Sequence, residues 1–493
     1  MSAIKQLVGQ TAIYGLSSML GRLLNYFLVP LHTLRLSTQE YGVITEVYAT
    51  IGFLAILLIY GMETAFFRYY HKHEQTNRVI ATALFAVLCS TVLFWLFSSL
   101  FFNDIVTVLK YEQFPEYITL LLLIVGVDAL CAIPQANLRA KNRPVWFASV
   151  NLISILVNIG LNIFFIGFCM KWHTSGEHNF WVDTFYNPHI GFGYIFVANL
   201  FASIVKLALL SPQYAYLKHK VSTKLLTNML RYAWPLLLMG LAGMINETLD
   251  RILLKHLLTP EIGLEAAQAQ EGIYGACYKL SILITLFVQA FRFAAEPFFF
   301  NQYKQADSEQ IYAKVMSIFI GFCLFMFLAV CLFLPFLKHF LQRETYWEGL
   351  HVVPVLLIAN ICLGVVYNLS VWYKLSDKTR YGAILAGVGA LITLSINFIF
   401  IPTYGYTASA WATLFCYATM MVLSYLIGRR HMPIPYPLKK IAMYALIAGS
   451  IFLANGFLFD TDASVVGTIL KSLILIGFGI IVWISEKPKK VVI

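Results

Sequence analysis

The sequence predicts an all-α polytopic membrane protein with about fourteen transmembrane helices, and three observations lead to this class. First, 59% of the 493 residues are hydrophobic and only 12% are charged, about half the charged fraction of a soluble domain. Second, apolar runs of about 20 residues, enough to cross the hydrocarbon core, recur along the whole chain. Third, lysine and arginine concentrate in every second connection between these runs.

Short polar turns such as "LRAKNRP" (138–144) separate the apolar runs and set the helix boundaries. No segment between the runs is long enough to form a soluble domain. We expect membrane-spanning helices near residues 8–33, 42–67, 79–102, 115–138, 145–169, 191–213, 229–254, 272–298, 312–336, 351–373, 381–402, 405–428, 438–458 and 463–485.

The charged residues predict the orientation of these helices. Lysine and arginine outnumber aspartate and glutamate at the N-terminus, in nearly every even-numbered loop and in the C-terminal tail, whereas the alternate loops are neutral or acidic. The positive-inside rule therefore places both termini in the cytoplasm. The net charge of +11 follows from this topology, and nucleic acid is not an expected partner.

Signals for enzymatic chemistry are weak. The eight cysteines are scattered and form no CxxC pair, which favours buried, inert thiols. No GxxxxGK[ST] pattern occurs, so ATP hydrolysis is not expected. The histidines of the longest outer loop lack metal-ligand spacing. We expect no catalytic residue, no bound metal and no cofactor.

An internal repeat relates the two halves of the chain. "LNYFLVPLHTLRLSTQEYG" (24–42) pairs with "INETLDRILLKHLLTPEIG" (245–263), and "METAFFRYYHK" (62–72) with "AEPFFFNQYKQ" (295–305). An insertion, "LEAAQAQEGIYG", separates these two blocks in the second copy. Further along, "NIGLNIFFI" (158–166) pairs with "TLSINFIFI" (393–401), and "HIGFGYIFVANL" (189–200) with "TYGYTASAWATL" (403–414).

The repeated unit is six helices, and an even number keeps the two copies parallel. We therefore expect two parallel six-helix bundles, residues 1–215 and 225–428, followed by two additional transmembrane helices and a cytoplasmic tail in residues 436–493. Two related bundles around a central cavity are typical of transporters.

Charged residues inside the spans are candidate functional residues because burial of a charge in lipid is costly. "GLSSMLGRLLNYFLVPL" (15–31) holds Arg22 near its centre, and Asn25 shares a helix face with it. The other intramembrane candidates are the cations Lys206, Lys279, Arg292 and Arg68, the polar residues Asn246, Glu63 and Glu296, and the acids Asp128, Asp250 and Glu247.

Structural explanations for these residues stay open. Arg292 and Glu296 are one helical turn apart, as are Glu247 and Arg251, so each pair could neutralise itself. Lys206 could extend its ammonium toward the membrane surface, and Arg68 could be an ordinary cytoplasmic anchor. The acidic residues could pair with nearby basic side chains.

Three stretches carry a family resemblance: "YGMETAFFRYYHK" (60–72), "RYAWPLLLMGLAGMINETLDRILL" (231–254) and "GIYGACYKLSILITLFVQAFRFAAEPFFF" (272–300). With them the chain resembles Wzx-type polysaccharide-unit flippases, polysaccharide biosynthesis proteins of the multidrug/oligosaccharidyl-lipid/polysaccharide exporter (MOP) superfamily. The resemblance implies a flippase in the bacterial inner membrane. Such a protein moves polyprenyl-pyrophosphate-linked oligosaccharide to the outer leaflet by alternating access, for O-antigen, lipopolysaccharide or capsule.

On this resemblance, we expect the five cations to contact the pyrophosphate while Asn25, Asn246, Glu63 and Glu296 line the cavity. Asp128, Asp250 and Glu247 would couple transport to H⁺ or Na⁺, and the polyprenyl tail would lie along the last two helices. The expected partners are the lipid-linked oligosaccharide, membrane lipids and other polysaccharide-assembly proteins.

Other functions of the same superfamily are alternatives. Multidrug extruders use acidic residues in the first bundle, whereas Arg22 in the first span here favours an anionic cargo. A lipid II flippase would share the lipid-linked pyrophosphate, and lipid scrambling or a channel is a further alternative. A membrane-embedded glycosyltransferase or polymerase is disfavoured because no loop is long enough for a catalytic domain.

Overall fold

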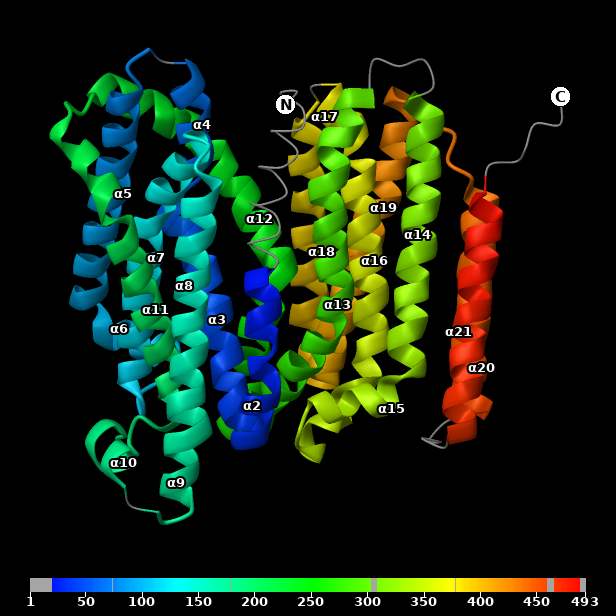
Figure 1. The fold of residues 1–493 in the computed structure, drawn as a ribbon, viewed down its shortest axis with the longest axis horizontal. Helices are drawn as coiled ribbons and strands as arrows, with labels where there is room; N and C mark the ends of the chain where they lie inside the picture. Colours follow the sequence, from blue (N-terminus) through cyan, green and yellow to red (C-terminus); the bar gives the residue numbers. More distant parts are fainter. Residues whose placement is uncertain are drawn as a thin grey trace. The chain divides into compact units, whose positions relative to one another are not determined.

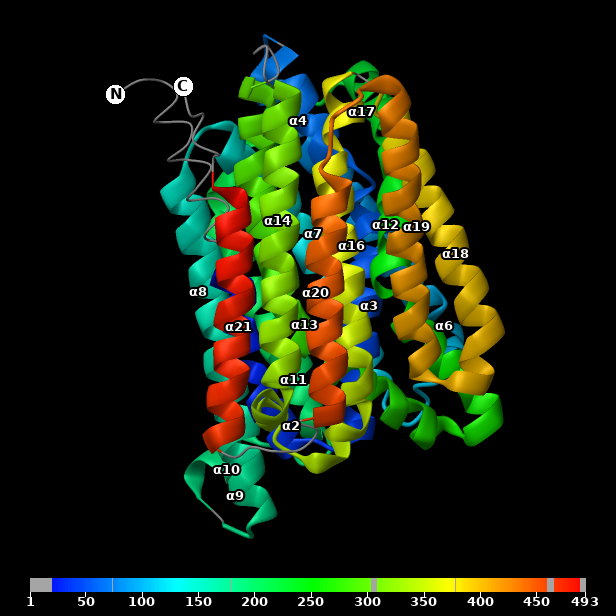
Figure 2. The same ribbon diagram turned by 90° about the vertical axis from the view of Figure 1, so that its right-hand side faces the viewer.

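A computed structural model describes residues 20–72, 74–177, 179–302, 308–376, 378–458 and 465–487, and these residues form helices and connections without a strand (Figures 1 and 2). Twelve helical segments among them are long and apolar enough to cross a membrane. The predicted all-α polytopic class is confirmed. The segments are Thr38–Lys72, Thr76–Leu100, Pro115–Ala140, Pro144–Thr174, Gly191–Lys218, Leu264–Arg292, Ser308–Leu332, Glu344–Leu375, Arg380–Tyr404, Tyr406–His431, Leu438–Gly456 and Val465–Glu486.

Two of the fourteen expected spans are not among these twelve. The span at 8–33 begins outside the described residues, and its described part is helical over residues 20–26 and in α2 (Leu28–Arg35). The span at 229–254 lies inside α12 (Thr223–Ile262), a helix of 40 residues. Glu247, Asp250 and Arg251 interrupt the apolar run of this helix.

The chain forms two compact units, Met1–Ile252 and Leu253–Ile493, which divide within α12. Most of α12, which contains the seventh expected span, therefore belongs to the first unit. At Gly61, whose φ of +75° suits glycine, an added Cβ would lie 3.0 Å from the Ala233 carbonyl oxygen of α12. The repeat predicts a boundary between the two bundles near residues 215–225. Because this boundary is based on sequence similarity and not on contacts, it stays a prediction.

In the first unit α7 is the central helix. It packs against α3, α5 and α11, and α8 packs against α11. Within the described residues, 72% of the α7 span is buried, more than of any other span. The elements are α3 (Thr38–Ile59), α4 (Met62–Lys72), α5 (Thr76–Leu100), α6 (Phe102–Val108), α7 (Pro115–Ala140), α8 (Pro144–Asn162), a π-helical turn (Ile163–Cys169), α9 (Met170–Thr174), α10 (Phe180–Phe185), α11 (Tyr194–Leu210) and two 3₁₀ segments (Gly191–Gly193 and Ser211–Lys218).

The second unit repeats this packing order. Its central helix, α16, packs against α13, α14 and α19, and α18 packs against α19. The last two helices, α20 and α21, both pack against α14. The elements are α13 (Leu264–Gln302), α14 (Ser308–Leu332), α15 (Leu334–Leu337), α16 (Val353–Leu369), α17 (Val371–Leu375), α18 (Arg380–Tyr404), α19 (Tyr406–His431), α20 (Leu438–Leu458), α21 (Val465–Glu486) and two 3₁₀ segments (Lys338–Phe340 and Glu344–Val352).

One pair of equivalent residues shows the repeat at atomic detail. Asn162 of α8 donates to the Asn158 carbonyl at 2.8 Å, and Asn397 of α18 donates to the Thr393 carbonyl at 2.7 Å. Both asparagines are fully buried. Each also bonds a second helix: the Asn162 Oδ1 lies 2.9 Å from the His32 Nε2, and the Asn397 Oδ1 accepts from Ser409 at 3.0 Å. The intrahelical bond therefore recurs in the two equivalent helices, whereas the second bond joins α8 to α2 in the first unit and α18 to α19 in the second.

The insertion "LEAAQAQEGIYG" is helical rather than a loop. Gly263, at φ +84°, ends α12, and α13 begins one residue later at Leu264. The inserted residues form the first three turns of α13, so this helix begins well before the expected boundary at 272. Its inserted part holds Glu271, which is fully buried.

Replacing either buried asparagine should destabilise its own unit. Asn162→Ala and Asn397→Ala each leave a buried partner without its hydrogen bond, so we expect each to lower the free energy of unfolding by about 1–3 kcal/mol. Equilibrium unfolding in mixed micelles measures the change. Asn77→Ala, at an exposed position of α5, should change it by less than about 0.5 kcal/mol. A loss in only one of the two variants would contradict their equivalence.

Candidate functional site

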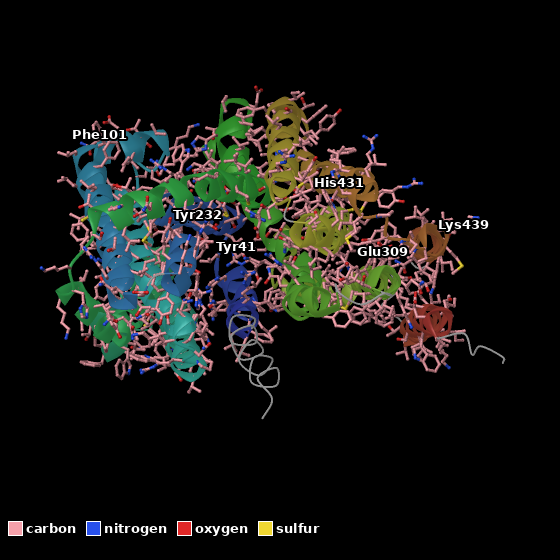
Figure 3. The ribbon with its side chains drawn as sticks, turned by 90° about the horizontal axis from the view of Figure 1, so that it is seen from above. Tyr41, Phe101, Tyr232, Glu309, His431 and Lys439 are labelled. Atoms are coloured by element: carbon pink, nitrogen blue, oxygen red, sulfur yellow. The ribbon has the colours of Figure 1, made fainter. Side chains whose placement is uncertain are left out.

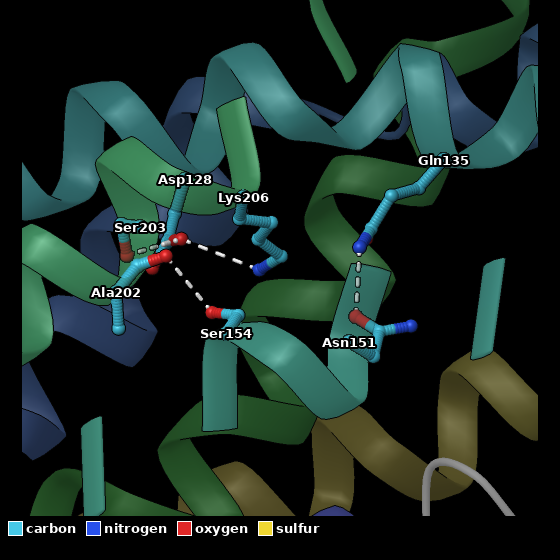
Figure 4. Close-up of polar contacts among 7 residues, drawn as sticks. All are labelled: Asp128, Gln135, Asn151, Ser154, Ala202, Ser203 and Lys206. Carbon is cyan, nitrogen blue, oxygen red and sulfur yellow. Dashed lines mark hydrogen bonds and ion pairs between the residues drawn. The ribbon is translucent and has the colours of Figure 1, made fainter. Parts of the chain in front are cut away.

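A charged cluster lies between α7 and α11 of the first unit (Figure 4). The Ser203 hydroxyl donates to the Asp128 Oδ1 at 2.9 Å, and the Lys206 Nζ lies 3.4 Å from the same oxygen. Ser203 and Lys206 are three residues apart on α11, so both reach toward the carboxylate on α7. The side chains of Asp128 and Lys206 are 32% and 21% exposed. The pair thus lies within membrane-spanning helices, and both side chains are partly exposed at the protein surface.

The ammonium of Lys206 is only partly satisfied by this pair. Ammonium–carboxylate hydrogen bonds are usually about 2.7–2.9 Å long, whereas this one measures 3.4 Å. An ammonium has three N–H donors, and Asp128 is its single hydrogen-bond acceptor within the described ranges. Lys206 therefore retains donors for an external anion.

Further polar side chains surround the cluster, and the sequence analysis did not select them (Figure 4). Gln135 of α7 donates to the Asn151 Oδ1 of α8 at 2.9 Å, and the Ser154 hydroxyl of α8 donates to the Ala202 carbonyl at 2.9 Å. Amides and hydroxyls inside apolar spans are the signal that would have found them. They connect α7, α8 and α11 through polar contacts.

The structure joins two residues that the sequence analysis assigned to separate roles. Lys206 was expected to contact the pyrophosphate and Asp128 to couple an ion. Their ion pair also matches the structural alternative for Asp128, pairing with a basic residue. One site therefore holds both candidate groups.

Arg22 and Asn25 lie on the helical residues 20–26, with both side chains exposed. Asn158 of α8 donates to the Asn25 Oδ1 at 3.2 Å, so Asn25 links this segment to α8. In the part of the chain that the structure describes, Arg22 has neither a hydrogen bond nor an ion pair. Its guanidinium is available to a ligand.

Glu63 and Arg68 of α4 contact neighbouring helices of the first unit. The Glu63 carboxylate forms an ion pair with Arg139 of α7, which is the structural alternative for an intramembrane acid. The exposed Arg68 guanidinium lies 4.1 Å from the ring centroid of Tyr232 on α12. Glu63 therefore contributes to the contact between α4 and α7.

The polar residues of α12 differ in burial. Asn246 and Asp250 are buried, whereas the Glu247 side chain is exposed. Arg251 donates from its Nη1 to the backbone carbonyl of Glu247 at 2.9 Å, and from its backbone N–H to the Asp250 Oδ1 at 2.9 Å. Asp250 is thus held in place by the backbone of its own helix.

Lys279, Arg292 and Glu296 lie on α13 of the second unit. Lys279 is half-buried, and the exposed Arg292 guanidinium lies 4.6 Å from the ring centroid of Tyr367. The side chain of Glu296 lies outside the described residues, so its pairing with Arg292 stays a prediction.

Two fully buried charges of the second unit escaped the sequence analysis. Lys255 of α12 and Glu271 of α13 are both completely buried. The expected spans ended at 254 and began at 272, which placed both residues outside the membrane. The longer helices seen in the structure bring them into the protein interior.

Residues 7–302 match the family model described as "Polysaccharide biosynthesis protein". No curated protein matches the sequence. A lipid II flippase MurJ structure, in an inward closed conformation, aligns with a TM-score of 0.67 at 14% identity and covers 96% of this chain and 99% of that one.

An inward-facing multidrug resistance MATE transporter of the MOP superfamily aligns with a TM-score of 0.64 at 15% identity, covering 87% of this chain and 98% of that one. An outward-facing MATE structure gives 0.58 at 15% identity over the same shares. These similarities establish the fold. Because the family model spans more than half of the sequence, the chain belongs to the polysaccharide biosynthesis protein family, and it has the fold of MOP-superfamily transporters.

Proposed function

We propose that the protein is a flippase that moves polyprenyl-pyrophosphate-linked oligosaccharide from the cytoplasmic to the outer leaflet by alternating access. The partly coordinated ammonium of Lys206, inside a membrane span of a polysaccharide biosynthesis protein, carries this proposal. The similar MurJ structure is that of a lipid II flippase, so the fold serves a lipid-linked cargo in at least one protein.

The chemistry of the cargo explains why cations would line the path. A pyrophosphate loses its hydration on entering the membrane, and this cost must be offset by charged or hydrogen-bonded partners. Arg22 offers a planar guanidinium that can grip two phosphate oxygens, and Lys206 offers a compact charge. Arg68, Lys279 and Arg292 would supply further contacts along the path.

The polar sugars and the hydrophobic polyprenyl tail of the cargo need different surroundings. The sugars would pass through a hydrated path, while the polyprenyl tail stays in lipid. α20 and α21 suit the tail because only 11% and 17% of their spans are buried by protein. We place the protein in the bacterial inner membrane with both termini in the cytoplasm, where other polysaccharide-assembly proteins would supply the cargo.

Asp128 is the best candidate for ion coupling in this proposal. When a phosphate binds the ammonium of Lys206, the Asp128 carboxylate loses its counter-charge and needs another cation. A proton or Na⁺ can fill that role, which links cargo binding to ion binding at one site. Asp250 and Glu247 of α12 are the alternative coupling residues.

A multidrug or metabolite extruder of the same superfamily is the second candidate. The accessible carboxylate of Asp128 in the first unit favours it, because an acid can bind a cationic drug. The exposed Arg22 favours an anionic cargo instead. The two functions predict opposite charges for the transported molecule.

Removal of the cationic groups should slow flipping. Arg22→Ala or Lys206→Ala removes a charged hydrogen bond to the pyrophosphate, and we expect initial rates about ten to one hundred times lower. Proteoliposomes loaded with lipid-linked oligosaccharide, probed by an outside glycosidase, measure the rate. Arg143→Ala, at an exposed position between α7 and α8, is the matched arginine control.

Uptake of a cationic dye without movement of the lipid-linked sugar would overturn the flippase proposal in favour of the extruder. Flipping at the wild-type rate in both alanine variants would instead support the flippase proposal but exclude Arg22 and Lys206 as contacts of the cargo.

Loss of the carboxylate should uncouple transport from the ion gradient. Asp128→Asn keeps the shape of the side chain and can still accept from Ser203, but it cannot exchange a proton. We expect wild-type flipping to change with an imposed H⁺ or Na⁺ gradient and flipping by Asp128→Asn to be independent of both. A gradient response that persists in the variant would exclude Asp128, and the same test then applies to Asp250.

A further inference from the structure

A basic pocket lies at one end of α14, α20 and α21 in the second unit. It has a volume of about 290 Å³, and the charged residues that line it are Lys314, Lys440, Lys487 and Glu486. Glu309 and Lys439, at the N-terminal ends of α14 and α20, mark this end of the unit in Figure 3. Three lysines against one glutamate give the pocket an excess of positive charge.

The single acid of the pocket is already occupied by protein donors. The Glu486 Oε1 accepts from Ser317 of α14 at 2.5 Å and from Tyr444 of α20 at 3.1 Å. It also pairs with the Lys440 Nζ at 2.7 Å. The Glu486 side chain is only 11% exposed. This carboxylate therefore neutralises Lys440 and ties the three helices together.

The other two lysines keep their donors. Lys314 of α14 and Lys487, which follows α21, are both exposed. The Lys487 Nζ lies 3.4 Å from the ring centroid of Trp483, a contact that holds the ammonium over the indole face while its N–H groups stay available. Lys314 and Lys487 thus line the pocket from α14 and from the residue that follows α21.

The surroundings of the pocket are those of the membrane surface. α20 and α21 have spans that are only 11% and 17% buried, against 61% for α14. The apolar side chains of Leu473, Ile476 and Ile480 are exposed, so protein does not cover this side of α21. Trp483 and Lys487 at its end are residue types that settle at the level of lipid headgroups. The predicted topology puts this end in the cytoplasm, whose leaflet is anionic.

We propose that this pocket binds the phosphate of an anionic glycerophospholipid of the cytoplasmic leaflet. The phosphodiester would accept from Lys314 and Lys487, and the acyl chains would run along the uncovered faces of α20 and α21. Because Lys314 belongs to α14 and Lys487 directly follows α21, the bound lipid holds the peripheral helix pair against α14. The proposal concerns a resident lipid and is independent of the transported cargo.

Lipid binding to the purified full-length protein in detergent tests this site. We expect phosphatidylglycerol to bind and to raise the melting temperature, and phosphatidylcholine to do neither. The double variant Lys314→Gln/Lys487→Gln should bind phosphatidylglycerol about ten to thirty times more weakly. Lys338→Gln is the matched control, since the Lys338 Nζ also lies over an indole, 4.2 Å from the Trp347 centroid, and it should bind as the wild type does.

Equal binding of phosphatidylglycerol to the wild type and to the double variant would overturn the proposal. So would stronger competition by farnesyl diphosphate than by phosphatidylglycerol, since the pocket would then bind a lipid pyrophosphate. If the double variant does not fold, Lys487→Gln and Lys487→Arg decide instead: weaker binding is expected only in the glutamine variant. The measurement involves no transport, so its failure leaves the flippase proposal untouched.

Discussion

The structure depends on one constraint: a lipid bilayer offers no water to the polar groups inside it. Each backbone N–H and C=O group must then be satisfied within its own helix, which explains the all-helical fold. Side chains obey the same constraint. Asn162, Asn397 and Glu63, all far from the chain ends, each have a partner on another helix. These contacts fix which helices are neighbours in an otherwise apolar interior.

Against this background, the charged side chains differ in how completely they are paired. Lys206 meets its single described acceptor at 3.4 Å and stays partly exposed, although a buried charge normally needs close partners. Arg22 is exposed on its helix. By contrast, Glu63 forms a direct ion pair with Arg139 and is better explained by helix packing. Residues of equal charge in the sequence therefore differ in their pairing in the structure.

The sequence predicted the fold class well because the length and polarity of the apolar runs follow directly from the thickness of the bilayer. It could not predict that Lys206 meets Asp128, since helical periodicity gives a face but not the neighbour of that face. It also misplaced Lys255 and Glu271. A charged residue predicts the end of a span only if its side chain is exposed to water. Here both charged side chains are buried in the protein.

The repeat shows that the position of Lys206 is not charged in the second unit. The pairing of residues 189–200 with 403–414 places Tyr417 and Met420 at the positions of Ser203 and Lys206. In the second unit these two residues belong to an apolar cluster with Cys362 of the equivalent central helix α16. Two units with the same packing order thus differ in chemistry where their equivalent helices meet, α7 with α11 and α16 with α19. Within the described residues, the contact between α7 and α11 therefore offers a charged partner to an anionic group, whereas the cluster between α16 and α19 is apolar.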